Sequence, residues 1–284
     1  MGANSLAGVV GFLRLLRAYA QLDFMWVTRD FKQFASWYVA DILTSVAGAT
    51  AVFLLAQRFD GIGDWDQQQV LFMLGYGLMA RGLLEMFFAF NMAFISRRIG
   101  RGQLDHSLLQ PHPLWVNFLT EGFAPISGMG GLATGVAVTA YAASQLPVDV
   151  TPLWLGALGV NLIASAAIIL TFSFLLGSLA FWAPAPAEEI SMASMEVFGT
   201  LKSFPLDGAS TLLLGSLLSF LPVGFTAWLP SRALAGIDNN LLGLIATPIA
   251  AVALAILTAW VFKKGLTHYG STGSQRYSSF GFRR

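Results

Sequence analysis

The sequence predicts an all-α integral membrane protein with six transmembrane helices, and three observations lead to this fold class. The 284 residues are 56% hydrophobic and 11% charged, less than half the roughly 25% charge of a soluble domain. Six stretches reach the roughly 20 apolar residues that cross about 30 Å of hydrocarbon. Most of the Lys and Arg residues fall on one side of the six-span topology. A net charge of +1 predicts no nucleic-acid partner, and the lack of Cys excludes disulfides.

The first segment, residues 1–36, is predicted to be a helix in the cytoplasmic membrane interface. It mixes apolar residues with Arg14, Arg17, Arg29 and Lys32, a composition suited to lying in the headgroup region rather than to crossing. Two of the arginines follow the short apolar run at residues 6–13 instead of preceding it. We therefore expect no cleaved signal peptide.

The transmembrane domain is predicted to occupy residues 37–263. Its spans lie at about 37–57, 70–94, 115–142, 153–182, 204–229 and 241–262. After Pro184 and Pro186 end the fourth span, residues 188–203 place Ile190 and Val197 on one face, as in an interfacial helix. The fifth span is broken at Leu221-Pro222-Val223-Gly224, so it either re-enters the membrane or crosses with a kink.

The distribution of basic residues predicts that both termini are cytoplasmic. Only Arg58 and Arg232 lie outside, and Arg81 lies within a span, so the excess of positive charge is inside. The residues placed in the cytoplasm are Arg14, Arg17, Arg29, Lys32, Arg97, Arg98, Arg101, Lys202, Lys263, Lys264, Arg276, Arg283 and Arg284. The tail at 264–284, rich in Gly and Ser from Gly270 onwards, is expected to be disordered.

Arg81 and Glu85 are the charged pair of the second span. They lie four residues apart near its middle, hence on one helical face, and neither is expected to face lipid. Two interpretations fit them: a polar element of a substrate pathway, or a structural ion pair. Gly128, Gly131 and Gly135 in the third span predict close helix packing, either within the chain or between protomers.

Enzyme and metal sites are not supported by the pattern of polar residues. The three histidines all fall in predicted cytoplasmic segments, so a histidine site inside the membrane lacks candidates. Asp60, Asp64 and Asp66 share an external loop without a calcium-binding motif, which indicates a solvated surface. We predict no catalytic residue and no metal site.

The segment from Arg97 to Trp115 is the longest polar interruption of the apolar part of the chain. Residues 103–110 are predicted to form a short helix with Leu104, Leu108 and Leu109 on one side, ended by Pro111 and Pro113. Two interpretations fit this helix. It docks onto a cytoplasmic partner, or it connects two spans along the lipid headgroups.

Four stretches, taken in order, resemble a membrane subunit of the ABC type-2 permease family. They are Gly102-Gln103-Leu104-Asp105-His106-Ser107-Leu108-Leu109-Gln110-Pro111, Phe174–Trp182, Phe204-Pro205 with Pro222 and Pro230, and Gly265–Gly273. The resemblance covers nearly the whole chain and includes the six-span plan. Family members often carry Arg before the proline of the first motif, where this chain has Gln110.

The resemblance implies that residues 102–113 form a coupling helix seated on an ATPase. Its expected docking residues are Arg101, Gly102, Leu104, Asp105, Leu108, Leu109, Pro111 and Pro113. It also implies two ATPase subunits, a second permease that is identical or homologous, and export of a hydrophobic or amphipathic substrate. The expected location is the bacterial inner membrane, in contact with its lipids.

The chain itself is not expected to bind ATP. It contains no Gly-x-x-x-x-Gly-Lys-[Ser/Thr] phosphate loop, so ATP and magnesium are expected on the partner ATPase. Two alternatives remain from the residues alone. One is a stand-alone secondary carrier or channel that uses Arg81 and Glu85, and the other is a membrane scaffold that transports nothing.

Overall fold

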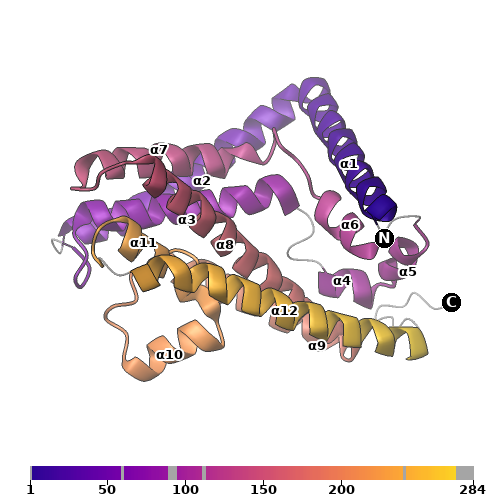
Figure 1. Cartoon of the computed structure of the whole chain (residues 1–284). Helices are drawn as coiled ribbons and strands as arrows, with labels where there is room; N and C mark the ends of the chain where they lie inside the picture. The colour runs from indigo at the N-terminus through magenta and orange to yellow at the C-terminus, as the bar shows by residue number, and fades with distance from the viewer. Residues whose placement is uncertain (1, 59–60, 89–94, 111–112, 239–240, 273–284) are drawn as a thin grey trace.

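The computed structural model describes residues 2–58, 61–88, 95–110, 113–238 and 241–272, where the regular elements are helices (Figure 1). Apart from them, one isolated antiparallel bridge joins Ile62 and Trp65. The helices are α1 (Gly2–Arg29), α2 (Phe31–Arg58), α3 (Gln67–Phe88), α4 (Ile95–Gly100), α5 (Gln103–Leu108), α6 (Leu114–Thr120), α7 (Met129–Gln145), α8 (Pro152–Gly177), η1 (Ser178–Phe181), α9 (Pro184–Leu201), α10 (Thr211–Ser219), η2 (Pro222–Phe225), α11 (Trp228–Leu234) and α12 (Leu241–Thr272).

Four helices of the described chain are long and apolar enough to cross a membrane: α2, α3, α8 with η1, and α12. A fifth candidate is the bent pair formed by α10 and the segment from η2 to α11, which meet at 72°. Length and composition thus support an all-helical, multi-pass membrane protein. Length and composition alone give up to five candidate spans among the described residues, fewer than the six predicted. The helices that fall short are α7, which has only 17 residues, and α9, whose 18 residues include three glutamates.

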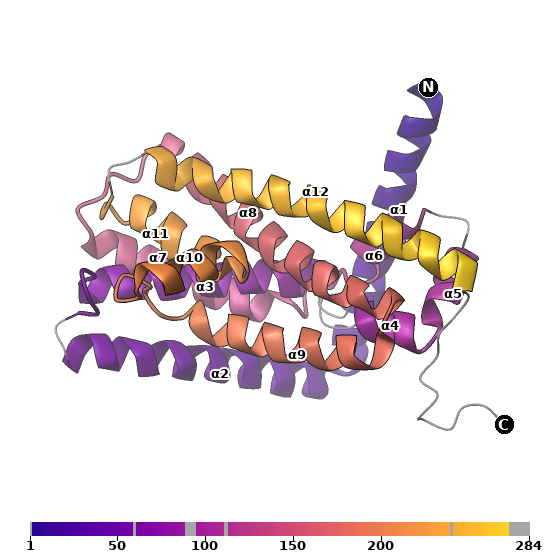
Figure 2. The same ribbon diagram turned by 90° about the horizontal axis from the view of Figure 1, so that it is seen from below.

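The centre of the bundle is α3, which packs against α2, α7 and α8. In turn α8 packs against α9 and α12 (Figures 1 and 2). Most of the α3 surface is buried, whereas α2 and α12 leave most of theirs exposed. The two outer helices thus present their apolar surface to the surroundings, as lipid-facing helices do.

Glycines bring α3 and α7 close together. A Cβ atom at Gly82 of α3 would lie 2.1 Å from the backbone nitrogen of Leu132, and one at Gly135 of α7 would lie 2.4 Å from that of Met79. Gly131 faces Gly82, and Gly128 faces the backbone of Met86. All three glycines highlighted in the third predicted span thus contact α3 of the same chain, which matches the packing role of small residues in membrane helices.

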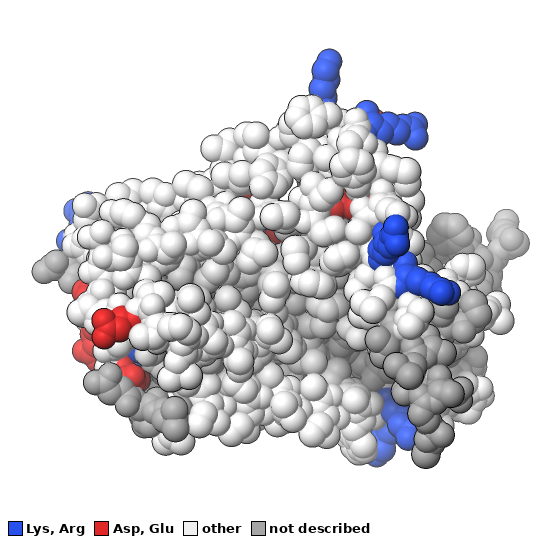
Figure 3. All heavy atoms as spheres, turned by 45° about the horizontal axis from the view of Figure 1, so that its top comes forward, with Lys and Arg blue, Asp and Glu red and all other residues white. Residues whose placement is uncertain are grey.

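The charged side chains gather at the two ends of the bundle (Figure 3). We call one the basic end, made of α4, α5 and the last turns of α12, and the other the acidic end, made of residues 61–66, Asp207 and Asp238. Figure 3 shows a broad, largely uncharged surface between them, with only small patches of acidic atoms. Such a surface is what the hydrocarbon core of a bilayer requires.

At the basic end, α1 lies steeply inclined to the bundle (Figures 1 and 2). The Asp23 carboxylate accepts hydrogen bonds from the backbone N–H groups of Ile126 and Ser127 at 2.7 and 3.1 Å and from the Ser127 hydroxyl at 2.6 Å. The predicted N-terminal helix is therefore present, tied to the segment before α7. It ends at Arg29, and residues 31–36 already belong to α2.

The chain passes from the basic end to the acidic end through α9, which differs from the predicted interfacial helix. Near its start, Glu188 accepts a hydrogen bond from Arg97 Nε at 2.6 Å, which is at the basic end. Shortly after it, Asp207 accepts a hydrogen bond from the Trp65 indole at the acidic end. The 18 residues of α9 cover about 27 Å at 1.5 Å per residue, and residues 202–206 complete the distance without helix. Lys202, predicted to be cytoplasmic, thus lies inside the bundle.

The predicted fifth span, 204–229, returns to the end from which it starts. Asp207 forms an ion pair with Arg232, so the chain between them leaves the acidic end and comes back to it. At the turn, the carbonyl of Phe225 accepts a hydrogen bond from Ser165 Oγ at 3.1 Å, and Ser165 lies 2.9 Å from the buried Tyr76 hydroxyl. The break is thus buried in protein, as backbone at membrane depth must be. The structure favours the re-entrant interpretation over a kinked crossing.

The acidic end is held together by Asp207. Its carboxylate accepts hydrogen bonds from the indole N–H groups of Trp65 and of Trp228, the latter at 2.7 Å, and pairs with Arg232. A second carboxylate, Asp238, pairs with Arg232 at 2.6 Å, and the hydrogen bond from this guanidinium lowers the pKa of Asp238 below its usual range. Residues far apart in sequence thus converge on a single acidic side chain.

Replacing Asp207 with alanine is expected to destabilise the protein by about 2–4 kcal/mol, because the buried Trp65 indole loses its acceptor and Arg232 loses one of its carboxylates. Thermal unfolding of the detergent-solubilised chain measures this effect. The matched control is Asp64→Ala, which removes an exposed carboxylate from the same end and should change stability by less than about 0.5 kcal/mol. Equal stabilities of the two variants would contradict the role of Asp207.

The predicted tail begins later than expected. Residues 264–272 continue α12, and at Gly265 the Phe181 ring packs directly on the helix: a Cβ at this position would lie 2.1 Å from Phe181 Cδ2. Residues 273–284, the rest of the predicted tail, lie outside the described residues, as do residues 89–94 of the predicted second span and Asp60 of the predicted external loop.

Candidate functional site

The first candidate site is α5 at the basic end, within the predicted range 103–110. The chain reverses between α4 and α5 at Gly102, whose φ of 70° lies in the left-handed region that favours glycine. The Gly102 N–H donates to the carbonyl of Ile99 at 3.1 Å, which closes this turn. The turn at Gly102 thus places the short helix α5 across the end of the bundle.

The first turn of α5 is fixed to the rest of the chain. Leu104 is fully buried in a second hydrophobic core at the basic end, together with Ile95, Phe181 and Tyr269. Beside it, the Tyr269 hydroxyl donates a 2.6 Å hydrogen bond to the Asp105 carboxylate. The short helix is therefore tied to α4, to η1 and to the end of α12.

Glycine also shapes the second core. A Cβ at Gly177, at the end of α8, would lie 1.9 Å from Ile95 Cγ2, so only glycine lets α4 approach this closely. Gly177 and Gly265 come from two of the stretches that carry the family resemblance. Their positions give those motifs a physical reason: Gly177 lets α4 approach the end of α8, and Gly265 lets η1 approach α12.

The C-terminal end of α5 is exposed and apolar. Leu108 is 46% exposed and Leu109 84% exposed, while Arg101 just before the helix is also exposed. Two exposed leucines beside a cation form a small surface of the kind that an apolar groove accepts. Of the eight residues expected to dock, Pro113 is exposed before α6, Gly102 and Leu104 are buried, and Pro111 lies outside the described residues.

The second candidate site is a polar cavity inside the bundle. Arg81 Nε donates to Glu85 Oε1 at 2.6 Å along one face of α3, so the charged pair expected from the sequence is formed. The arginine side chain remains 48% exposed. A cavity of about 320 Å³ lies against this pair and against α8 and α9.

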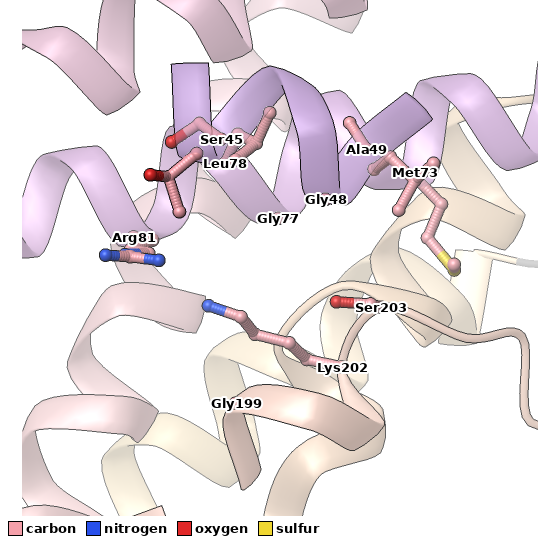
Figure 4. Close-up of a pocket in the computed structure, with 12 residues that line it drawn as sticks. Ser45, Gly48, Ala49, Met73, Gly77, Leu78, Arg81, Gly199, Lys202 and Ser203 are labelled. Carbon is pink, nitrogen blue, oxygen red and sulfur yellow. The ribbon is translucent and has the colours of Figure 1, made fainter. Parts of the chain in front are cut away.

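Lys202 joins this site from the end of α9. Figure 4 shows its ammonium and the Arg81 guanidinium directed toward the same space, with the hydroxyls of Ser45 and Ser203 nearby. A second cavity, of about 130 Å³, lies between α2, α3 and the end of α9 and is lined by these four residues among others. The last turn of α9 favours a cation here, because helix C-termini carry partial negative charge.

Sequence reasoning missed two residues that position these sites. Lys202 was assigned to the cytoplasm, although it follows a helix of 18 residues that starts after the fourth span, a length sufficient for most of a crossing. Asp23 was not recognised as the anchor of α1; an acid among the apolar and basic residues of this segment is the signal that points to it. In the described part of the chain, no group of three or more His, Asp or Glu side chains is placed to hold a metal.

Comparison with known proteins identifies the family of the chain. The family described as "ABC-2 family transporter protein" matches residues 30–273, from the end of α1 to the end of α12. No curated protein and no solved structure matched the chain. Because the family match covers most of the sequence, the resemblance to ABC type-2 permeases is confirmed. The chain belongs to the ABC-2 transporter family and is a multi-pass membrane transport subunit.

Proposed function

We propose that this permease is the membrane subunit of an ATP-driven exporter, whose ATP is hydrolysed on separate subunits seated against α5. The observation that carries the proposal is the difference between the two ends of α5. Leu104 and Asp105 fix its first turn to the bundle, and Leu108 and Leu109 are exposed at its C-terminal end. A docking helix needs both properties, because it must bind a partner and transmit that partner's movement.

The proposed topology has six crossings, with the basic end in the cytoplasm of a bacterial inner membrane. The crossing elements are α2, α3, α7, α8, α9 extended by residues 202–206, and α12. The segment from α10 to α11 re-enters from the acidic end, which lies outside. Moving Lys202 from the cytoplasm into the bundle leaves the orientation unchanged, because the basic residues of α1, α4 and α12 still lie at one end.

ATP binding requires another chain, since the sequence has no phosphate loop. The family match supports association with ABC ATPase subunits, and the assembly proposed has two of them together with a second permease, identical or homologous. In this assembly the surface of α5 faces one ATPase, while ATP and magnesium are bound entirely by the partners.

The mechanism proposed is a rigid-body movement driven by ATP. Closure of the paired ATPases moves α5, and the second hydrophobic core passes the movement to α8, α9 and α12, whose ends it joins. The cavities lie between α3 and α9, so a shift of α9 changes their access from one side of the membrane to the other. The differing affinity of ATP for the two states supplies the free energy of the shift.

The experiment that tests this function is purification of the tagged full-length chain from its native membrane in a mild detergent, followed by identification of the co-purifying proteins and an assay for ATP hydrolysis. We expect a phosphate-loop ATPase in the complex, with a stoichiometry that reveals whether the second permease is the same chain. A chain recovered alone even after crosslinking would overturn the proposal. It would favour a carrier or channel that works through Arg81 and Glu85, for which flux driven only by a gradient is the test.

A further inference from the structure

We infer that the polar cavity between α3 and the end of α9 binds the anionic headgroup of an amphiphilic substrate, with Arg81 and Lys202 as its two cationic contacts. This inference rests on the proposed function, because it names the substrate class of the same transport pathway. It assigns the charged pair on α3 a role in recognition, together with a lysine that comes from a different helix.

The charges that line the smaller cavity are both positive. Arg81 and Lys202 line it, together with the hydroxyl-bearing residues Thr44, Ser45 and Ser203, and Figure 4 shows the two cations converging from opposite sides. No carboxylate belongs to the described lining of this cavity. Two converging cations with hydroxyl donors nearby are a suitable environment for a phosphate or carboxylate group.

The existing negative charges do not neutralise this site. Glu85 binds Arg81 Nε at 2.6 Å, which leaves the pair neutral and orients the guanidinium. The Lys202 ammonium forms no ion pair within the described chain. The partial charge at the end of α9 amounts to about half an elementary charge at most. With Glu85 paired to Arg81, the charge of Lys202 remains in the smaller cavity for an anion to balance, whereas the carboxylate of Glu196 lies in the lining of the larger cavity.

The larger cavity favours an amphiphile with a single anionic end. Leu84, Ile169, Met195 and Phe198 give it an apolar side that suits a hydrocarbon chain. Glu196, which also lines this cavity, disfavours a second anionic group there. Its volume of about 320 Å³ lies at the low end of the range for ligand sites, so it accommodates a headgroup and the first part of a tail, and the rest lies along the bundle.

The test measures binding of dodecyl phosphate to the full-length chain in phosphatidylcholine nanodiscs by calorimetry. Dodecyltrimethylammonium and inorganic phosphate are the matched probes, one with the opposite charge and one without a tail. We expect dodecyl phosphate to bind at least about tenfold more tightly than either, because a charge-assisted hydrogen bond in a desolvated site contributes that much or more.

Lys202→Met, which keeps the length of the side chain and removes its charge, is expected to weaken dodecyl phosphate binding by about tenfold or more, and Lys202→Arg is expected to retain it within about threefold. The control is Lys263→Met, which removes an exposed lysine at the basic end and should leave the affinity unchanged. Comparing variants in identical nanodiscs cancels the partition of the probe into lipid.

Three results would overturn the inference: equal affinity of Lys202→Met and the unchanged chain, equal affinity for the anionic and cationic probes, or inorganic phosphate binding as tightly as dodecyl phosphate. The last would indicate a free anion rather than an amphiphile. The assay contains no ATPase, so its outcome is independent of the co-purification experiment. Selective binding by a chain that recruits no ATPase would refute the proposed function alone, and recruitment without selective binding would refute the substrate class alone.

Discussion

Replacing Leu109 with aspartate is expected to abolish the stimulation of the ATPase partner while the permease still folds and inserts. Leu109 is 84% exposed, so a charge there meets water in the free chain and costs little. In a docked complex the same carboxylate would be buried in an apolar groove, at a cost of several kcal/mol. A loss of 4 kcal/mol corresponds to about a thousandfold weaker binding. Leu108→Asp, at 46% exposure, should act in the same direction.

The measurement compares ATP hydrolysis and co-purification of the partner with the original and the altered permease. Leu153→Asp is the matched control, because Leu153 is 85% exposed but lies at the start of α8, away from α5. This variant should keep the stimulation. If Leu109→Asp and Leu108→Asp both retain full coupling, α5 is not the docking element. Leu104 is unsuitable for this test, because it is buried in the second core and a charge there would unfold the end of the bundle.

The position of Leu104 shows what the spacing of apolar residues within one segment predicts and what it cannot predict. Spacing predicted a helix at residues 103–110, and the structure has α5 at Gln103–Leu108. The same spacing grouped Leu104 with Leu108 and Leu109 on one side. It did not reveal that Leu104 itself is buried in a core with Phe181 and Tyr269, since contacts between residues so distant in sequence leave no trace in the periodicity of one segment.

The structure places α9 differently from the interfacial helix predicted at residues 188–203, and the membrane environment gives a physical reason for the difference. The sequence pattern placed Ile190, Ala193 and Val197 on one face of residues 188–203, as in an interfacial helix. In the structure these residues are exposed, and the buried residues of α9 are Ala187, Ser191 and Phe198. Helices in lipid place small residues against one another and leave large apolar ones outside. Glu188, which reduced the apolar character of the segment, is paired with Arg97 from α4.

The second large effect is expected at the contact between α3 and α7. Gly82→Ala would place a Cβ 2.1 Å from the backbone nitrogen of Leu132 and 2.5 Å from its Cα. Backbone cannot rotate away as a side chain can, so the two helices must separate along the whole contact. We expect a loss of about 2–3 kcal/mol in the free energy of unfolding, measured by titrating the chain from mild detergent into sodium dodecyl sulfate. Gly135→Ala should also lower the free energy of unfolding, because its Cβ would lie 2.4 Å from Met79 N.

Gly156→Ala on α8 is the matched control, because a Cβ there meets no described atom within 4 Å. Alanine has the higher helix propensity, so this variant should be neutral or more stable by up to about 1 kcal/mol. The same chemical change is thus expected to lower the free energy of unfolding at Gly82 and to leave it unchanged or raise it at Gly156. Equal stability of Gly82→Ala and Gly156→Ala would show that α3 and α7 are not packed this closely. A separated α3 would also displace Arg81 relative to Lys202, so Gly82→Ala should weaken dodecyl phosphate binding, whereas Gly156→Ala should not.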